Sequence, residues 1–348
     1  MTVHLHGDLL KMTKPDKILL DHGSGGALSH QLITQTLLPA FSNPLLLKLH
    51  DGAVLEVNEG RIAFSTDTFV VDPIFFPGGS IGDLAINGTV NDLCMCGAVP
   101  KYLSVGLILE EGFAFSDLER ILFDMKQAAL TAGVLIVTGD TKVVPRGAVD
   151  KVFINTTGIG FIPAQVQVAP SRITVGDRVI LSGSMADHGM TILSRRENLS
   201  FSGPVQSDTA ALNHLVKKMI AACPDIHMLR DPTRGGVGTT LNEVAESATV
   251  GIRIQEDKLL VKGAVSGMCE LLGIDPLYVA NEGKLLAFVP PAHAKTVIVA
   301  MQSDPLGAEA RIIGEVVSDH PGQVVMQTRI GGTRIIRMLT GEQLPRIC

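Results

Sequence analysis

Three aspartates in the first half of the chain have neighbours that suit metal and phosphate chemistry. Asp67 directly follows a predicted strand, Asp92 lies on a predicted helix, and Asp140 ends a second predicted strand. Mg²⁺ prefers hard carboxylate oxygens and keeps phosphate and water as further ligands. The pattern therefore predicts a Mg²⁺–nucleotide site with Asp67, Asp92 and Asp140 as metal ligands. An aspartate after a strand is also typical of a simple turn, so that alternative stays open.

Two glycine-rich loops precede predicted helices, at residues 22–26 (HGSGG) and 77–80 (PGGS). Glycine lets the backbone approach a ligand closely, so that N–H groups can surround phosphate oxygens. Leu285 follows Gly283-Lys284 where a P-loop would need a hydroxyl residue, so the familiar P-loop is absent. Glycines that only fill turns are the alternative. The predicted nucleotide-binding residues, aspartates included, are Gly25, Gly26, Asp67, Thr68, Gly78, Gly79, Asp92, Gly139 and Asp140.

Two further side chains could act on a bound substrate. Lys142 follows Asp140 by two residues and could steady a phosphoryl group, and Glu282 stands at the entrance of a predicted strand, where it could act as a base. A solvated surface lysine and a loop glutamate in water are the alternatives. Arg230, Asp231 and Arg234 form either an anion pocket or a surface ion pair.

The sequence ends in a cysteine that could carry cargo. After residue 340 it reads GEQLPRIC, in which glycine and proline discourage regular structure. We expect residues 341–348 to form a mobile tail, which reaches roughly 26 Å when extended at ~3.3 Å per residue. The thiol of Cys348 is then an accessible nucleophile on a tether.

Composition excludes several classes of protein. The chain has 348 residues, 46% hydrophobic and 18% charged, with a net charge of −6, which argues against capture of nucleic acid or of an anionic membrane. No stretch approaches the ~20 apolar residues that span a bilayer. The five cysteines are an odd number and no secretory leader precedes them, so we expect a cytoplasmic protein.

The order of predicted elements indicates two domains of the α/β or α+β class. Strands are predicted at residues 61–66, 101–109, 134–137 and 152–162, with one helix that stops at Pro39 and another whose N-cap is Ser116. The pattern restarts after a break at residues 163–170, with predicted strands at 178–181, 251–255, 284–290 and 311–317. We therefore expect a lead-in at residues 1–16, a domain at 17–163, a second domain at 171–340 and the tail.

Several motifs in a fixed order carry a resemblance that spans nearly the whole chain from His22. The sequence resembles the hydrogenase-maturation carbamoyl dehydratases (HypE), members of the superfamily of aminoimidazole ribonucleotide synthetase and selenophosphate synthetase. The motifs are HGSGG (22–26), STD (65–67), FFPGG (75–79), VTGDTKVV (137–144), RGAVDK (146–151), D-x-TRGGV (231–237), NEGK (281–284) and the terminal PRIC (345–348).

The resemblance implies a two-domain synthetase-like fold, whose N-terminal domain binds ATP and Mg²⁺ and forms a homodimer through its sheet. It implies that the partner HypF places a carbamoyl group on Cys348. ATP then drives dehydration of that group to a thiocyanate, and the cyanide passes to iron on a HypC–HypD complex. Glu282 is the expected base and Lys142 the expected phosphoryl-stabilising residue, although their roles can be exchanged. Cys94 and Cys96 have no family role and are interpreted as packing residues.

Two other functions stay open at this stage. A synthetase of the same superfamily could phosphorylate a small-molecule oxygen or selenium nucleophile, although a selenide-using relative would carry a reactive cysteine near its N-terminus and none precedes Cys94. A non-catalytic, nucleotide-gated carrier would only present the thiol to partners. Turnover by the carbamoylated protein distinguishes them.

Overall fold

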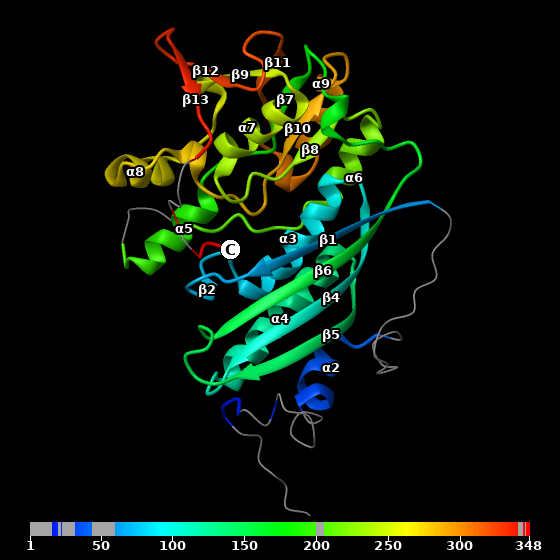
Figure 1. The fold of residues 1–348 in the computed structure, drawn as a ribbon, viewed down its shortest axis with the longest axis vertical. Coiled ribbons are helices and arrows are strands. Elements are labelled where there is room, and N and C mark those ends of the chain that lie inside the picture. Colours follow the sequence, from blue (N-terminus) through cyan, green and yellow to red (C-terminus); the bar gives the residue numbers. More distant parts are fainter. Residues whose placement is uncertain are drawn as a thin grey trace, which may run out of the picture.

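The computed structural model describes residues 16–19, 22, 32–43, 60–199, 205–339, 344 and 346–348. These residues form two large sheets and one two-stranded sheet, and Figure 1 shows the first large sheet in the lower half of the molecule and the second in the upper half. The expected α/β class with two parts is confirmed. None of the helices in the described ranges combines the length and the apolar character that a membrane crossing requires.

The first sheet has four strands in the order β1-β6-β4-β5 among the described residues. β4 and β5 are parallel, whereas β6 is antiparallel to β1 and β4. The strands are β1 (Arg61–Phe69), β4 (Val99–Glu110), β5 (Leu135–Val144) and β6 (Val152–Ile162). Shorter elements of this half are η2 (Ile33–Leu37), α2 (Leu38–Phe41), and the hairpin of β2 (Phe75–Phe76) and β3 (Gly79–Ser80).

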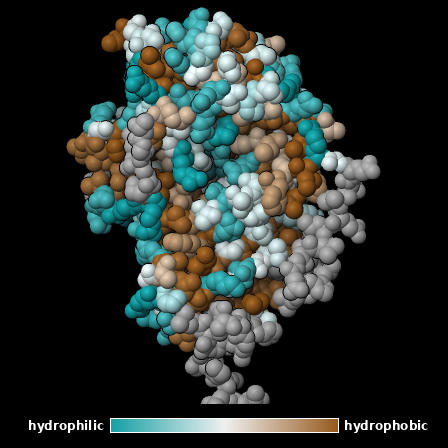
Figure 2. All heavy atoms as spheres, viewed as in Figure 1, coloured by the Kyte–Doolittle hydropathy of each residue, from teal (hydrophilic) through white to brown (hydrophobic). Residues whose placement is uncertain are grey.

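One face of this sheet packs on two helices, α3 (Ile81–Met95) and α4 (Phe115–Ala132), and no helix of the described residues covers the other face, which we call the open face. Burial alternates along β4 and β6, as expected when one face meets the core. On the open face Phe64 and Ile62 stay exposed, at 68% and 54%. Figure 2, in the same view, shows hydrophobic atoms in brown over the region of this sheet.

The second sheet has the order β13-β12-β9-β11-β7-β10-β8. Its strands are β7 (Arg178–Leu181), β8 (Met228–Arg230), β9 (Gly251–Gln255), β10 (Leu286–Val289), β11 (Arg311–Val317), β12 (Val324–Gln327) and β13 (Thr333–Ile336). The helical elements around it are η4 (Pro170–Arg172), α5 (Asp187–Arg196), α6 (Asn213–Ala222), α7 (Gly236–Ala248), η5 (Glu256–Lys258), α8 (Gly263–Leu272), η6 (Pro276–Tyr278), α9 (Ala294–Gln302) and η7 (Pro305–Gly307).

Helix α3 connects the two halves. Ser80 and Asp83 form a capping box that fixes the first turn of α3. The Ser80 side chain accepts from a backbone N–H of that turn, and the Asp83 side chain accepts from the backbone N–H of Ser80. Near the other end, the Asn91 amide donates to the main-chain oxygens of Ala210 at 3.0 Å and Glu282 at 3.2 Å. Its carbonyl oxygen accepts from the Leu212 N–H at 2.8 Å. One buried amide therefore ties α3 to two segments of the second half.

Most predicted elements are confirmed, but several boundaries are wrong. The strands expected at 152–162, 178–181, 251–255 and 311–317 match β6, β7, β9 and β11. β1 continues to Phe69 and β5 to Val144, so Asp67 and Asp140 lie inside strands and not at their ends. β5 continues through its polar residues because it pairs in parallel with β4 as far as Val144. The helix expected to stop at Pro39 continues to Phe41, and Ala114, not Ser116, is the N-cap of α4.

Candidate functional site

The end of the chain lies between the two halves, and Figure 1 marks it between α5 and β2. The Val70 N–H donates to the main-chain oxygen of Cys348 at 3.1 Å. The thiol lies beside the Glu282 carboxyl, and burial and the negative charge of that carboxyl raise the pKa of the thiol strongly. An open pocket of about 240 Å³ borders it, lined by Val70, Arg234, Gly235, Tyr278, Ala280, Leu339, Leu344, Arg346, Ile347 and Cys348.

Several hydrogen bonds hold the last residues in place. The His188 ring contacts the Ile347 oxygen at 2.7 Å, and the Arg196 guanidinium donates to the Arg346 oxygen at 2.7 Å. The Arg346 side chain pairs with Asp150 at 2.7 Å. Residues 346–348 are therefore docked in this state by polar partners from both halves, and the mobility of the tail stays a prediction. Residues 340–343 and 345 lie outside the described residues.

Glu282 is buried, with 4% exposure, so the alternative of a loop glutamate in water is wrong. Its N–H donates to the Asp208 carboxylate at 3.0 Å. Its Oε1 has no hydrogen-bond partner among the described residues. Burial raises the pKa of Glu282 well above its ordinary value, and the negative charges of Asp208, Asp231 and Asp67 add to this effect. The site thus contains a carboxyl group that binds a proton strongly, next to the terminal thiol.

Further acidic groups share this environment. Burial raises the pKa of Asp67 and of Asp92, and the Ser65 hydroxyl donates to Asp92 at 2.7 Å. Burial and then the charge of Asp92 raise the pKa of Asp231 to about 7. Arg234 opposes this charge at Asp67, Glu282 and Cys348, and Arg230 together with Arg234 opposes it at Asp92.

Asp140 and Lys142 lie elsewhere in the single chain. Across the sheet, Asp140 is in register with Gly106, then Asn155, then Thr68. Residues in register share a face, and neighbours along a strand point to opposite faces, so Asp140 lies on the face opposite to that of Asp67. Asp140 and Lys142 pair at 3.6 Å with 74% and 65% of their side chains exposed.

The predicted cluster of three aspartates is therefore not assembled within one chain. The described ranges contain no group of three or more His, Cys, Asp or Glu side chains arranged to hold a metal. The residues present still fit Mg²⁺, which commonly binds one or two carboxylates together with phosphate and water. Asp67 and Asp92 supply hard oxygens whose burial and repulsion a cation would relieve. These two are the candidate ligands, and a ligand role of Asp140 stays a prediction.

The predicted glycines have packing reasons in this structure. A Cβ at Gly78, whose φ is +90°, would lie 2.7 Å from the Ser207 oxygen, and one at Gly79 would lie 2.7 Å from Thr209. A Cβ at Gly139 would lie 2.5 Å from the main-chain oxygen of Val105 in β4. Gly78 and Gly79 thus face protein backbone and side chain, and their role in nucleotide binding stays a prediction. Gly25 and Gly26 lie outside the described residues.

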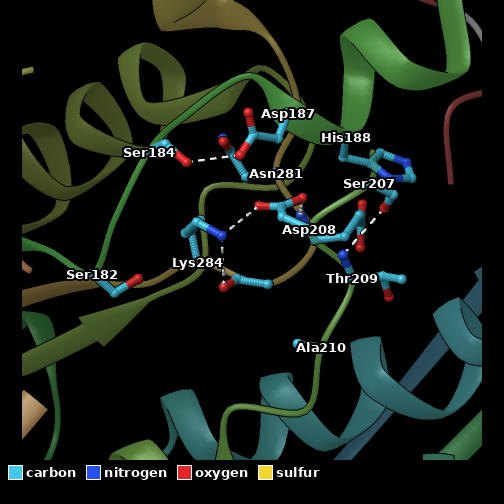
Figure 3. A network of polar contacts seen from close by, with 12 residues as sticks. Ser182, Ser184, Asp187, His188, Ser207, Asp208, Thr209, Ala210, Asn281 and Lys284 are labelled. Carbon is cyan, nitrogen blue, oxygen red and sulfur yellow. Dashed lines mark hydrogen bonds and ion pairs between the residues drawn. The ribbon is translucent and has the colours of Figure 1, made fainter. Parts of the chain in front are cut away.

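Sequence reasoning missed a buried ion pair beside Glu282. Lys284 contacts the Asp208 carboxylate at 3.2 Å, with 12% and 3% of the side chains exposed, and Figure 3 shows the two pointing toward each other. The NEGK motif contains Lys284 and could have directed attention to it. Asp208 stands in a segment without a motif, so only the tertiary structure reveals it. Thr68 does not join this cluster and accepts from the Asn155 amide at 3.0 Å.

Both halves of the chain match known domains. Residues 49–162 match the AIR synthase related protein N-terminal domain, and residues 174–327 match the corresponding C-terminal domain. The carbamoyl dehydratase HypE of Azotobacter vinelandii is 51% identical over 327 residues, which cover 94% of this chain and 96% of that protein. The same protein of Escherichia coli K12 is 48% identical over 338 residues, which cover 96% and 100%.

Solved structures agree with the sequence relatives. A crystal structure of the hydrogenase maturation protein HypE in complex with ATP is 52% identical, has a TM-score of 0.92 and covers 95% of this chain and 99% of its own. A HypE–HypF complex is 45% identical with a TM-score of 0.78, covering 88% and 99%. The matches extend over nearly the full length and over both domains. The chain belongs to the HypE family of carbamoyl dehydratases within the AIR synthase related proteins.

Proposed function

We propose that this chain catalyses, in the cytoplasm, the ATP-dependent dehydration of a carbamoyl group carried by its own Cys348. The product is a thiocyanate whose cyanide serves nickel–iron hydrogenase maturation. The observation that carries the proposal is the position of the Cys348 thiol beside the buried Glu282 carboxyl. An amide attached to this sulfur stays beside that carboxyl, so effective concentration replaces substrate affinity.

The chemistry requires the amide oxygen to become a good leaving group. The carbamoyl oxygen attacks the γ-phosphorus of ATP, the bond to ADP breaks, and one N–H proton is lost, which gives an imidic phosphate. The carbon–oxygen bond then breaks and the second N–H proton is removed as the nitrile forms. The products are the thiocyanate, ADP and inorganic phosphate, so the net change on the sulfur is the loss of one water.

Glu282 is the proposed base for the N–H proton. Its pKa is raised by burial and by nearby carboxylates, so once ionised it binds a proton more strongly than an exposed glutamate. The buried Oε1, which has no partner among the described residues, offers a free acceptor. Arg234 supplies positive charge at the same place.

ATP and Mg²⁺ are the proposed cosubstrate and cofactor. A relative of 52% identity has been crystallised in complex with ATP, which supports ATP for this chain. Asp67 and Asp92 are the residues proposed to hold Mg²⁺. Bound there, Mg²⁺ would neutralise charge on the triphosphate.

A homodimer through the open face of the four-stranded sheet is part of the proposal. Phe64 and Ile62 expose apolar surface there, and a second copy of this face would cover it. Asp140 and Lys142 lie in β5 and are exposed on the same face, so in such a dimer they face the partner subunit. This arrangement supports a role for Lys142 in the pocket of the second subunit.

The proposed partners are HypF, which would load the carbamoyl group, and a HypC–HypD complex, which would receive the cyanide. Support for HypF comes from the solved HypE–HypF complex of a relative. Each partner would need the terminal cysteine outside its pocket, so the docked end of the chain must leave and return.

The test is single turnover of the isolated, carbamoylated full chain. With Mg²⁺ and ATP, mass spectrometry of the C-terminal peptide should show the loss of one water, with ADP and phosphate formed in equal amounts. The Cys348→Ala variant should bind ATP and form no product. A carbamoylated wild-type preparation that binds ATP yet never loses water would overturn the enzyme proposal and favour a carrier.

A further inference from the structure

A short segment, Ser207–Asp208, links the two reacting groups of the proposed site. The Ser207 N–H donates to the main-chain oxygen of Pro77 at 2.9 Å, which holds the segment against the first half of the chain. Gly78 permits this approach, because a Cβ there would lie 2.7 Å from the Ser207 oxygen. The main chain of this segment is therefore held in place independently of its side-chain contacts.

Ser207 reaches the end of the chain through one histidine. The His188 Nδ1 lies 2.7 Å from the Ser207 hydroxyl, and its Nε2 lies 2.7 Å from the Ile347 oxygen. A carbonyl oxygen can only accept, so Nε2–H donates to Ile347 and, in the neutral ring, Nδ1 accepts from Ser207. The Thr209 N–H donates to the same hydroxyl at 3.1 Å and completes its bonding. The Ile347 carbonyl thus sets the histidine tautomer, and the Ser207 hydroxyl holds the other ring nitrogen and so orients the ring.

Asp208 reaches the proposed base through the backbone. Its Oδ1 accepts from the Glu282 N–H at 3.0 Å, and its Oδ2 lies 3.2 Å from the Lys284 ammonium. A Cβ at Gly283 would lie 1.8 Å from the main-chain oxygen of Asp208, so the turn between Glu282 and Lys284 packs directly on this segment. Figure 3 shows Asp208 between Lys284 on one side and the Ser207–His188 pair on the other.

We propose that Ser207 and Asp208, with Lys284 as the counter-ion of Asp208, are positioning residues that align the Cys348 thiol with the Glu282 carboxyl. Ser207 acts through His188 on the residue before the cysteine, and Asp208 acts through the main chain of Glu282. The inference rests on the proposed dehydratase function for its catalytic part and on geometry alone for the docking of the tail.

The charge of Asp208 has a separate effect. The charged groups around Glu282 are Asp208, Asp231, Asp67 and Arg234, and the neutral Cys348 thiol lies beside it. Burial raises the pKa of Asp208, but the charge of Lys284 and the hydrogen bond from the Glu282 N–H outweigh it and hold that pKa below its ordinary value. Asp208 is therefore ionised, and after burial it is the largest cause of the raised Glu282 pKa. Removing its charge should lower that pKa.

The catalytic part is tested with Asp208→Ala and Asp208→Asn in the carbamoylated full chain. The alanine variant loses the acceptor for the Glu282 N–H, and we expect the single-turnover rate to fall about 100-fold, the scale of a misplaced catalytic group. Asparagine keeps an acceptor oxygen without the charge, so a loss of about tenfold is expected. In Asp208→Asn the rise of the rate with pH should also shift to lower pH.

Asp304 provides a matched control. It too is buried, pairs with Lys218 at 3.0 Å, and accepts from the Leu306 N–H at 3.1 Å, but it is not among the groups around Glu282. Asp304→Ala should lower the thermal midpoint and leave the turnover rate and its pH profile unchanged. Equal rates in Asp208→Ala and Asp304→Ala, with wild type active, would overturn the positioning role of Asp208.

The docking part is tested without turnover, by alkylation of Cys348 in the unmodified chain. His188→Ala and Ser207→Ala remove one link to Ile347, so iodoacetamide should label the C-terminal peptide about fivefold faster, the scale of one hydrogen bond. His214→Ala is the control, because His214 makes a similar 2.9 Å contact to the Thr131 oxygen on the surface. Labelling rates that match those of the control would overturn this link. Failure of wild-type turnover alone would sink the proposed function and leave this result standing.

Discussion

The Cys348 thiol lies beside the buried Glu282 carboxyl, between the two halves of the chain, and the charge of that carboxyl acts on the thiol. The thiol stays protonated in this position, because burial and the carboxyl both raise its pKa. The docked cysteine is therefore a poor nucleophile. Loading by a partner must happen when the end of the chain is outside, and the reaction of the loaded group when it is inside.

Glu282→Gln should abolish the chemical step and spare binding. Glutamine keeps the size of the side chain and loses the base, so single-turnover dehydration should fall by roughly 10²- to 10⁴-fold, the usual contribution of a general base. ATP affinity should stay within about twofold of wild type. In wild type the rate should rise with pH through the Glu282 pKa, which lies well above 4.5, because only the ionised carboxyl accepts the proton. A Glu282→Gln rate equal to that of wild type would remove Glu282 from the mechanism.

Asp231→Asn should change how stability depends on pH. The pKa of Asp231 is raised from 3.8 to about 7, so between these values the folded chain holds a proton that the unfolded chain has lost. The free energy of unfolding therefore falls as pH rises through this window. Urea titrations should show a shallower fall in Asp231→Asn, which gains on the order of 2–4 kcal/mol relative to wild type by pH 7. Asp231→Glu is the control and should retain the slope, whereas parallel curves for Asn and wild type would contradict the prediction.

Arg196→Ala should release the end of the chain. Arg196 donates to the main-chain oxygens of Asp72 at 2.8 Å and Arg346 at 2.7 Å and so joins the tail to the segment after β1. Loss of these bonds should raise the alkylation rate of Cys348 by about tenfold, as expected for bonds from a charged donor. The exposed neighbour Arg195 serves as the control, since Arg195→Ala should label at the wild-type rate. Equal labelling of both variants would show that Arg196 does not hold the tail.

Phe64→Asp should prevent the proposed homodimer. Phe64 is 68% exposed on the open face of the sheet, and a carboxylate buried there without a partner would be costly. Light scattering should then report a monomer with an unchanged circular dichroism spectrum. Phe123 on α4 is similarly exposed, at 59%, on the other side of the sheet, so Phe123→Asp should stay dimeric. A dimeric Phe64→Asp variant would place the interface elsewhere.

Mixed dimers should show whether Lys142 serves the second subunit. The Lys142→Ala chain keeps its own cysteine, and the Cys348→Ala chain keeps its lysine. Each alone should be inactive, and a co-refolded mixture should regain turnover at the cysteine of the Lys142→Ala chain. Lys101, also exposed, provides the control, since Lys101→Ala alone should keep its activity. A mixture that stays inactive while forming mixed dimers would contradict a role for Lys142 across the interface.

Local sequence determined the elements and several chemical groups. Strands β6, β7, β9 and β11 were predictable because alternation and turn residues act over a few neighbours. The terminal cysteine and the glutamate of NEGK were predictable because both belong to short motifs whose order along the chain is itself informative. The family and the two-part α/β architecture followed from the same strings.

Tertiary structure decided which of these groups meet. Asp67 and Asp140 looked equivalent as aspartates near predicted strand ends, but the strands continue, and a period of two then sends the side chains to opposite faces of one sheet. The position of Asp208 was not predictable, because it lies in a segment without a motif that packs between Gly78 and Glu282 only in the folded chain. The end of the chain docks because Val70, His188 and Arg196, distant in sequence, satisfy its backbone. Such contacts depend on chain closure over long separations, which no local pattern encodes.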